Sequence, residues 1–185
     1  MNFEDMIWLF NSDPKIPGTR NIIRMDLPEA AMLWKCVRRT QNSVLEIGRN
    51  LGGSTSLLIA AANPRKVISI DISSAIPAGW ERQWNKTQEF FSKHSNLQLI
   101  VGDSRKVKVA DKLGFLFIGG DHTYEGVKAD ILQHWDSLGV GGLAAFHDAA
   151  IKSVPRKAIN DILLKTGKAK IVEYVWSLLV VEKIN

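Results

Sequence analysis

The chain has 185 residues, of which 45% are hydrophobic and 23% charged, as is typical of a soluble globular domain. Lys and Arg exceed Asp and Glu by 24 to 19, but the basic residues are scattered, so the net charge of +5 favours a solvated surface over a nucleic-acid-binding face. No apolar run approaches about eighteen residues, and the acidic Glu4 and Asp5 argue against a signal peptide, so we expect no membrane contact.

We expect residues 1–40 to form a helical segment that covers a pocket, ahead of a main domain over residues 41–185. Apolar residues recur at helical spacing near its start: Phe3, Met6, Ile7 and Phe10. A loop-like run from Ser12 to Thr19 follows, and Asp26 with Pro28 is typical of the cap and first turn of a second helix. Exposed apolar residues in the first helix would permit a homodimer.

Strands and helices alternate over the rest of the chain. The expected strands are Ser43–Ile47, Val67–Ile70, Leu97–Val101, Phe115–Ile118, Leu143–Phe146, Ile171–Val175 and Leu178–Val181. The expected helices are Ser54–Ala62, a helix with Trp80, Trp84 and Phe91, Tyr124–Leu138 and Val154–Leu164. Short, nearly continuous apolar strands between helices indicate an α/β protein, with a doubly wound, mostly parallel sheet covered on both faces. The last two strands leave no room for a helix between them, which predicts a C-terminal antiparallel hairpin.

A glycine-containing loop follows the first strand, and its sequence from Glu46 to Thr55 is EIGRNLGGST. Glycine lets the backbone turn sharply and approach a ligand, and the next helix offers unpaired N–H groups at its start. The match to a G-x-G-x-x-G dinucleotide fingerprint is poor, because Asn50 holds the position of the second glycine. Glu46, two residues before Gly48, suits a cationic group such as an amino acid's ammonium. A tight strand-to-helix turn would explain the loop equally well.

Polar residues also follow the second and third strands. Asp71 could accept hydrogen bonds from a ribose diol, and Asp103 or Ser104 could bond an adenine edge. Each residue alone could be a helix cap or a turn. Three such features, in order on successive strand ends, favour a nucleoside-binding site beyond the carboxyl edge of the sheet.

These residues lie in segments that resemble the class I S-adenosylmethionine-dependent methyltransferases, in particular their catechol-O-methyltransferase-like and cephalosporin-hydroxylase-like branches. The resemblance runs from Asn42 to Lys183 through VLEIGRNLGGST, VISIDI, LIVGDS, FIGGDHTYEGVKAD and GGLAAFHDA. It implies a Rossmann-like, seven-stranded sheet and S-adenosyl-L-methionine as cofactor. The cofactor residues that it implies are Glu46, Gly48, Asn50, Gly52 and Ser54 at the methionine end, Asp71 and Ile72 at the ribose, and Asp103 and Ser104 beside the adenine.

The resemblance also directs attention to the ends of the fourth and fifth strands. Methyl transfer needs a positioned acceptor and a base to remove its proton, and we expect a hydroxyl of a small molecule as the acceptor. His122 is the expected general base, at the position of a catalytic lysine in the catechol-O-methyltransferase-like branch, with Asp121 and Asp148 as supporting catalytic groups. His122 could instead cap the helix that follows it.

A magnesium site is a further implication of the resemblance. Asp121, His147 and Asp148 could supply oxygen and nitrogen ligands to Mg²⁺. The resembling enzymes carry an aspartate where this chain has Gly119, which weakens such a site considerably. Asp121 could point the same way if the strand continued past Gly119, since side chains alternate along a strand. Asp121 could also serve the cofactor, and Asp148 could be a turn residue.

Other readings stay open. The chain could be a cofactor-binding module that has lost catalysis, a nicotinamide-dependent oxidoreductase, or a nucleic-acid methyltransferase. The single cysteine, Cys36, has no motif around it and is expected as a buried thiol, which fits a reducing cytoplasm as the location. Trp80 and Trp84 are expected in the core, and His94 and His134 on helix surfaces.

Overall fold

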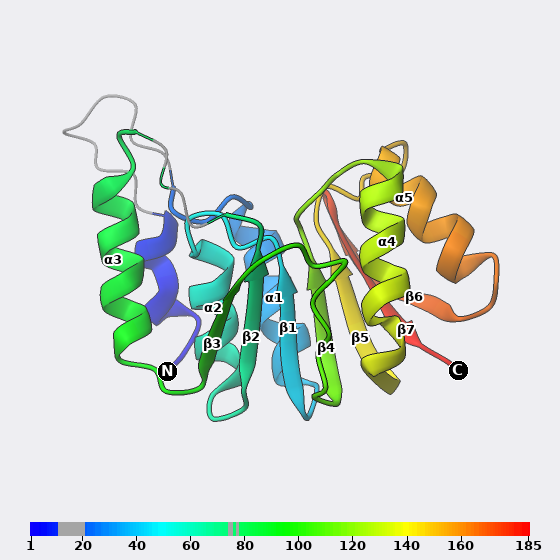
Figure 1. Ribbon diagram of the computed structural model, residues 1–185, viewed down its shortest axis with the longest axis horizontal. Helices are drawn as coiled ribbons and strands as arrows, with labels where there is room; N and C mark the ends of the chain where they lie inside the picture. Colours follow the sequence, from blue (N-terminus) through cyan, green and yellow to red (C-terminus); the bar gives the residue numbers. More distant parts are fainter. Residues whose placement is uncertain (11–20, 74–75, 77) are drawn as a thin grey trace.

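The computed structural model of the chain describes residues 1–10, 21–73, 76 and 78–185, so the loop expected from Ser12 to Thr19 lies outside the described residues. A seven-stranded sheet in the order β3-β2-β1-β4-β5-β7-β6 forms its centre (Figure 1). The strands are β1 (Ser43–Ile47), β2 (Val67–Asp71), β3 (Leu97–Val101), β4 (Leu113–Ile118), β5 (Leu138–Phe146), β6 (Ala169–Val175) and β7 (Leu178–Lys183). The α-helices are α1 (Leu27–Arg38), α2 (Gly53–Ala62), α3 (Glu81–Ser92), α4 (Tyr124–His134) and α5 (Val154–Ile159). Two 3₁₀ helices, η1 (Glu4–Phe10) and η2 (Trp135–Ser137), and a π-helix, η3 (Asn160–Leu164), complete the described helices.

Strands β1 to β5 pair in parallel, whereas β7 is antiparallel to both β5 and β6. The predicted doubly wound α/β sheet with a C-terminal antiparallel hairpin is therefore confirmed. Because the first five strands share one direction, their carboxyl ends meet along one edge of the sheet, the upper edge in Figure 1. Loops from several strands converge there, which is where open sheets of this kind bind ligands.

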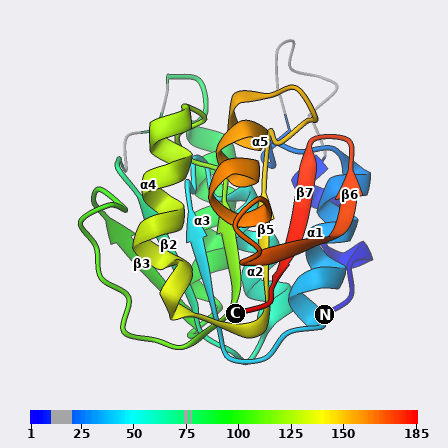
Figure 2. The same ribbon diagram turned by 90° about the vertical axis from the view of Figure 1, so that its right-hand side faces the viewer.

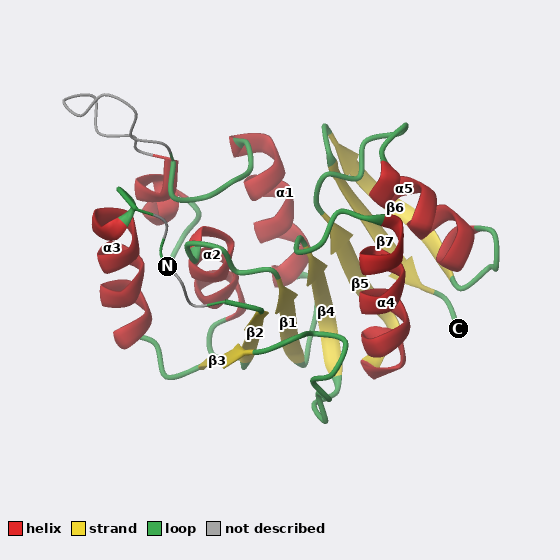
Figure 3. Ribbon diagram, turned by 45° about the horizontal axis from the view of Figure 1, so that its top comes forward, coloured by secondary structure: helices red, strands yellow, loops and turns green. Residues whose placement is uncertain are grey.

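Helices cover both faces of the sheet, as Figures 2 and 3 show from two further directions. One apolar cluster joins η1, α1, α2 and α3 to one face, and a second cluster joins α4 and α5 to the other. Neighbouring strand residues divide between the clusters: Val44 and Phe115 belong to the first, Leu45 and Leu116 to the second. This burial on both faces is why the parallel strands are continuous apolar runs in the sequence.

Helix α1 begins as its sequence predicts. Asp26 is the N-cap and Pro28 lies in the first turn, while a Glu29 Oε2 atom accepts a hydrogen bond from the Asp26 backbone N–H at 3.0 Å. Cys36, on the inner face of the helix, is fully buried, and burial raises the pKa of its thiol to about 11. The thiol is therefore protonated and unreactive, in agreement with the sequence prediction.

Three expectations about the helices were wrong. The helix predicted up to Leu138 ends at His134, and Leu138 is the first residue of β5. His134 is buried instead of exposed, because its Nε2 atom lies 3.0 Å from the Ser104 carbonyl oxygen in the segment after β3. Trp80 and Trp84 are only half-buried, because the face of α3 that packs inward carries other side chains. No helix in the described ranges is long and apolar enough to span a membrane.

Phe115 on β4 provides a test of this packing. Its side chain is completely buried within the first cluster, so Phe115→Ala should lower the free energy of unfolding by about 3–5 kcal/mol. Denaturant unfolding followed by circular dichroism measures the change. Leu132→Ala is the control, since Leu132 on α4 is 57% exposed and its truncation should be nearly neutral. Equal losses for the two variants would contradict the described core.

Candidate active site

Two adjoining cavities open at the carboxyl edge of the sheet. The first has a volume of about 570 Å³ and lies over the ends of β1, β2, β3 and β4. The second has a volume of about 360 Å³ and lies between the ends of β4 and β5 and the segment that precedes α1. Gly48, Asn50 and Gly119 line both cavities, so a ligand in one can touch a ligand in the other.

The glycine loop after β1 forms the wall between the cavities. Gly48 has a φ of +90°, and a Cβ at this position would lie 2.6 Å from the Gly120 Cα atom, so only glycine allows the two loops to approach. Asn50 also has a left-handed φ of 51°, which asparagine tolerates. One oxygen of Asp71, at the end of β2, accepts hydrogen bonds from the Arg49 and Asn50 backbone N–H groups, both at 2.8 Å. Asp71 therefore holds the loop in place as well as lining the first cavity.

Glu46 lies beneath the glycine loop and not on a cavity wall. Its carboxyl group is fully buried and accepts hydrogen bonds from three hydroxyls: Ser54 at 2.5 Å, Thr55 at 2.6 Å and Ser69 at 2.5 Å. Burial raises the pKa of Glu46 above its usual range, against the opposing effect of these hydrogen bonds. Glu46 thus joins β1 to the first turn of α2 and to β2.

The far wall of the first cavity comes from the segment after β3 and from α4. The Asp103 carboxylate pairs with the Arg105 side chain at 2.7 Å, and this hydrogen bond lowers the pKa of Asp103 to about 2. The Ser104 hydroxyl donates to Asp130 at 2.6 Å. Asp130 is only 2% exposed, and burial raises its pKa. Sequence reasoning missed Asp130, although a carboxylate between Val127 and Ile131 on the inward face of a helix was the available signal.

Asp121 lines the first cavity, away from the fifth strand. Strand β4 ends at Ile118, so the alternation that would have directed Asp121 toward β5 does not continue. The carboxylate instead accepts the Thr123 backbone N–H at 2.8 Å, and this hydrogen bond lowers the pKa of Asp121. It packs so closely on α4 that a Cβ at Gly126 would lie 2.2 Å from its Cγ atom.

The second cavity contains the histidines expected near the chemistry. His122 Nε2 lies 3.3 Å from an Asp148 carboxylate oxygen, and His147 Nδ1 lies 3.1 Å from the same oxygen. On its other side, His147 Nε2 faces a Glu29 oxygen at 3.5 Å. Sequence reasoning missed Glu29, because an acidic residue is common in the first turn of a helix. The four side chains therefore form one continuous row from α1 to the start of α4.

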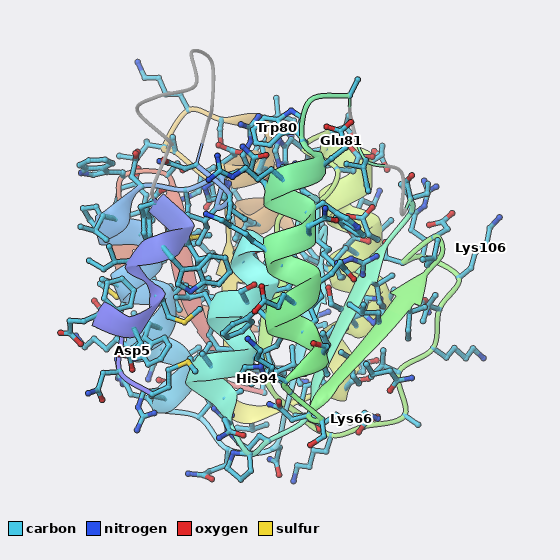
Figure 4. All side chains as sticks on the ribbon, turned by 90° about the vertical axis from the view of Figure 1, so that its left-hand side faces the viewer. Asp5, Lys66, Trp80, Glu81, His94 and Lys106 are labelled. Atoms are coloured by element: carbon cyan, nitrogen blue, oxygen red, sulfur yellow. The ribbon has the colours of Figure 1, made fainter. Side chains whose placement is uncertain are left out.

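The segment before α1 supplies another wall of the second cavity through Ile22, Arg24 and Met25. The Arg24 guanidinium lies over the Trp80 ring, 5.3 Å from its centroid. Figure 4 shows Trp80 at the N-terminal end of α3 and His94 near the opposite end. His94 is therefore remote from this edge of the sheet. The role of residues 1–40 as a pocket cover stays a prediction.

The residues predicted from the sequence to bind the cofactor lie in the first cavity, in the second cavity or behind the cavity walls. The first cavity is lined by Gly48, Asn50, Asp71, Ile72, Asp103 and Ser104. Ser54 lines the second cavity. Glu46 and Gly52 lie behind the walls, and a Cβ at Gly52 would lie 2.6 Å from the Phe91 ring. The binding roles of all these residues stay predictions.

The magnesium ligands implied by the resemblance are not brought together. Within the described ranges, no three His, Cys, Asp or Glu side chains form a group that could hold a metal ion. Gly119 contributes no side chain, Asp121 turns toward α4, and only His147 and Asp148 of the expected set are in contact. These residues do not fit a magnesium site.

The chain is a doubly wound α/β protein with a glycine loop after its first strand, a carboxylate at the end of the second and polar groups at the end of the third. The chain belongs to the methyltransferase-domain family, because the family model described as "Methyltransferase domain" matches residues 45–149, more than half of its length. With this fold, it is a class I S-adenosylmethionine-dependent methyltransferase. Nothing supports the nicotinamide-dependent oxidoreductase considered from the sequence. No curated protein matches the sequence significantly.

Solved methyltransferase structures share the fold at low sequence identity. The O-methyltransferase NovP is 14% identical with a TM-score of 0.73, and the match covers 98% of each chain. CalS11, a TDP-rhamnose 3'-O-methyltransferase, is 16% identical with a TM-score of 0.62 over 85% of this chain and 78% of its own. The Podospora anserina methyltransferase PaMTH1, solved with S-adenosylhomocysteine, is 13% identical with a TM-score of 0.64 over 98% of this chain and 87% of its own.

Asp71→Ala tests the first cavity. The substitution removes both the acceptor that holds the glycine loop and the carboxylate expected at the ribose, so affinity for S-adenosylhomocysteine should fall roughly 10- to 100-fold. Titration calorimetry measures the affinity. Asp111→Ala is the matched control, because Asp111 pairs with Lys66 at 3.1 Å at the opposite end of the sheet (Figure 4). Unchanged affinity in Asp71→Ala would remove Asp71 from the binding site.

Proposed function

We propose that the protein transfers a methyl group from S-adenosyl-L-methionine to a hydroxyl oxygen of a small molecule. The observation that carries the proposal is the junction of the two cavities at Gly48, Asn50 and Gly119. One cavity is lined by the expected nucleoside-binding residues and the other by His122 and Asp148. NovP and CalS11, which share the fold, are O-methyltransferases, and this supports an oxygen acceptor.

The first cavity suits the cofactor. Its volume of about 570 Å³ is within the usual range for small-molecule sites, roughly 300–1,000 Å³. Asp71 ends the strand where a ribose is expected, and Ile72 presents an exposed apolar side chain at the cavity wall. When bound, S-adenosyl-L-methionine supplies the sulfonium methyl group, whose C–S bond breaks as the O–C bond forms and leaves S-adenosylhomocysteine. The protein must therefore orient the acceptor and accept its hydroxyl proton.

His122 is the base in this proposal. In the neutral ring, Nε2 carries the hydrogen and faces the Asp148 carboxylate at 3.3 Å. The other ring nitrogen, Nδ1, is then free to accept the proton of the acceptor hydroxyl. The Asp148 carboxylate then faces the charge that develops on the ring, as in other histidine–carboxylate pairs. Asp121, which the sequence also suggested as a catalytic group, is better suited to the cofactor side because it lines the first cavity.

The proposed transfer uses no step through magnesium. Gly119 and the orientation of Asp121 leave an incomplete ligand set, as described above. Activity and cofactor binding should therefore be unchanged after treatment with a chelator and dialysis. Loss of turnover in the chelator that returns on adding Mg²⁺ would contradict this expectation.

Calorimetry with S-adenosylhomocysteine, with NAD as the parallel control, tests cofactor choice. Incubation with S-adenosyl-L-methionine and a panel of hydroxylated small molecules, followed by mass spectrometry, tests transfer. Binding together with a mass gain of one methyl group on an acceptor supports the proposal. Binding without transfer to any acceptor would favour the inactive binding module, and absence of binding would overturn the cofactor assignment.

The sequence also permits a homodimer and predicts a cytoplasmic location, and it leaves a nucleic-acid acceptor open; each is tested by a separate measurement. A homodimer is tested by light scattering of the purified protein, and a cytoplasmic location by fractionation of the source cells. A nucleic-acid acceptor, the reading suggested by the net charge of +5, predicts salt-dependent binding to oligonucleotides.

His122→Gln tests the base. The glutamine keeps a polar side chain but cannot accept the hydroxyl proton effectively, so kcat should fall roughly 10²- to 10⁴-fold. Affinity for S-adenosylhomocysteine should stay within about twofold, because His122 does not line the first cavity. The matched control is His94→Gln, at the far end of α3, which should keep full activity. A kcat for His122→Gln equal to that of the parent would assign the proton transfer to another group.

A further inference from the structure

Glu29, in the first turn of α1, is a buried carboxylate that faces His147, a residue in the wall of the second cavity. It is 2% exposed, and its Oε1 atom accepts hydrogen bonds from the Ser177 backbone N–H at 2.9 Å and from the Ser177 hydroxyl at 2.7 Å. Burial alone would raise the pKa of Glu29, but the hydrogen bonds from Ser177 and Asp26 outweigh it and lower the pKa. The group is therefore a fixed negative charge.

His147 lies between this charge and Asp148. Its Nδ1 atom is 3.1 Å from Asp148 Oδ2, and its Nε2 atom is 3.5 Å from Glu29 Oε2. The second contact is not a hydrogen bond, and among the described residues the buried Nε2 atom has no hydrogen-bond partner. Buried polar atoms rarely lack a partner, and the Glu29 carboxylate is the acidic group that faces this side of the ring.

The backbone around Asp148 is anchored on both sides. The His147 N–H donates to the Ile118 carbonyl at 3.1 Å, and the Ala149 N–H donates to the Ser177 carbonyl at 2.7 Å. Between them, Asp148 adopts a left-handed φ of 53°, which is unfavourable for most residues and is kept here by these contacts. Ser177, in the turn between β6 and β7, thus holds both Glu29 and the segment that carries Asp148.

We propose that Glu29 and His147 are positioning residues that fix the Asp148 carboxylate against His122. Neither residue acts on the acceptor itself. They hold the carboxylate so that His122 keeps one ring orientation, in the way that outer hydrogen-bond partners orient metal ligands and catalytic bases. The inference rests on the proposed function of His122 and names the residues that this function would require.

The test is Glu29→Gln, which keeps the size of the side chain but removes its charge. The expected result is a loss of kcat of roughly 10- to 100-fold with KM for S-adenosyl-L-methionine within about twofold. The matched control is Glu173→Gln. Glu173 also joins α1 to the C-terminal hairpin, through Lys35 at 3.5 Å and Arg39 at 3.3 Å, but it does not line either cavity. It should keep the parent kcat.

Histidine-ring NMR gives a readout that does not depend on turnover. The chain has four histidines, so each ring can be assigned. Glu29→Gln should shift the ring signals of His147 and His122 and leave those of His94 and His134 in place. Changes confined to His147, with kcat unaltered, would overturn the proposal. If the parent protein binds S-adenosylhomocysteine but methylates no acceptor, the proposed function fails. The positioning of His122 is then tested by NMR alone: a shift of its ring signals in Glu29→Gln supports the inference, and unchanged signals contradict it.

A milder variant covers the case in which Glu29→Gln does not fold. Ser177→Ala removes the hydroxyl that supports Glu29 and keeps the backbone hydrogen bond, so a smaller loss of kcat and a smaller shift at both histidines are expected. Combining it with His147→Asn should add no further loss of kcat, because both changes act through Asp148. Fully additive losses of kcat would show that Ser177 and His147 do not both act through Asp148.

Discussion

The buried carboxyl group of Glu46 is the interaction on which the site depends most directly. A carboxyl group removed from water without hydrogen bonds costs several kcal/mol, so its three hydroxyl partners must stay where the structure has them. Two of them, Ser54 and Thr55, belong to the first turn of α2, and the third, Ser69, belongs to β2. Glu46 therefore fixes where β1 ends and α2 begins, and the glycine loop has to turn between those two points.

The second cavity repeats this arrangement with Glu29. Both carboxyl groups are buried, and both join elements that are distant in sequence. The two groups differ in the balance of burial and hydrogen bonding: burial raises the pKa of Glu46, whereas hydrogen bonds lower the pKa of Glu29. They also differ in their neighbours, because Glu46 binds three hydroxyls, whereas Glu29 also faces His147 at 3.5 Å. This contact is why Glu29, and not Glu46, belongs to the row of side chains that reaches His122.

The sequence predicted the sheet well, because strands buried on both faces are continuous apolar runs and their polar ends are easily located. It did not predict that β7 lies between β5 and β6, since a hairpin pattern does not say which strand pairs with the sheet. Glu29, Asp130 and His134 were missed for a different reason. A polar residue on a helix is usually solvated, and only the packing of α1 and α4 shows that these three face inward. Asp121 turns away from β5 because β4 ends at Ile118, as the sequence predicted, so the continuation past Gly119 that was also considered does not occur.

Residues before α1 form part of the wall of the second cavity. The Ile22 and Ile23 N–H groups both donate to the Leu9 carbonyl, at 3.0 and 3.2 Å, which attaches this segment to η1. A Cβ at Gly53 would lie 2.4 Å from the Ile23 Cα atom, so the segment packs directly on the start of α2. Substitution of Gly53 would therefore displace the glycine loop and the second cavity together. The wall of the second cavity beside Ile22 and Arg24 therefore rests on α2, the same helix that follows the glycine loop of the first cavity.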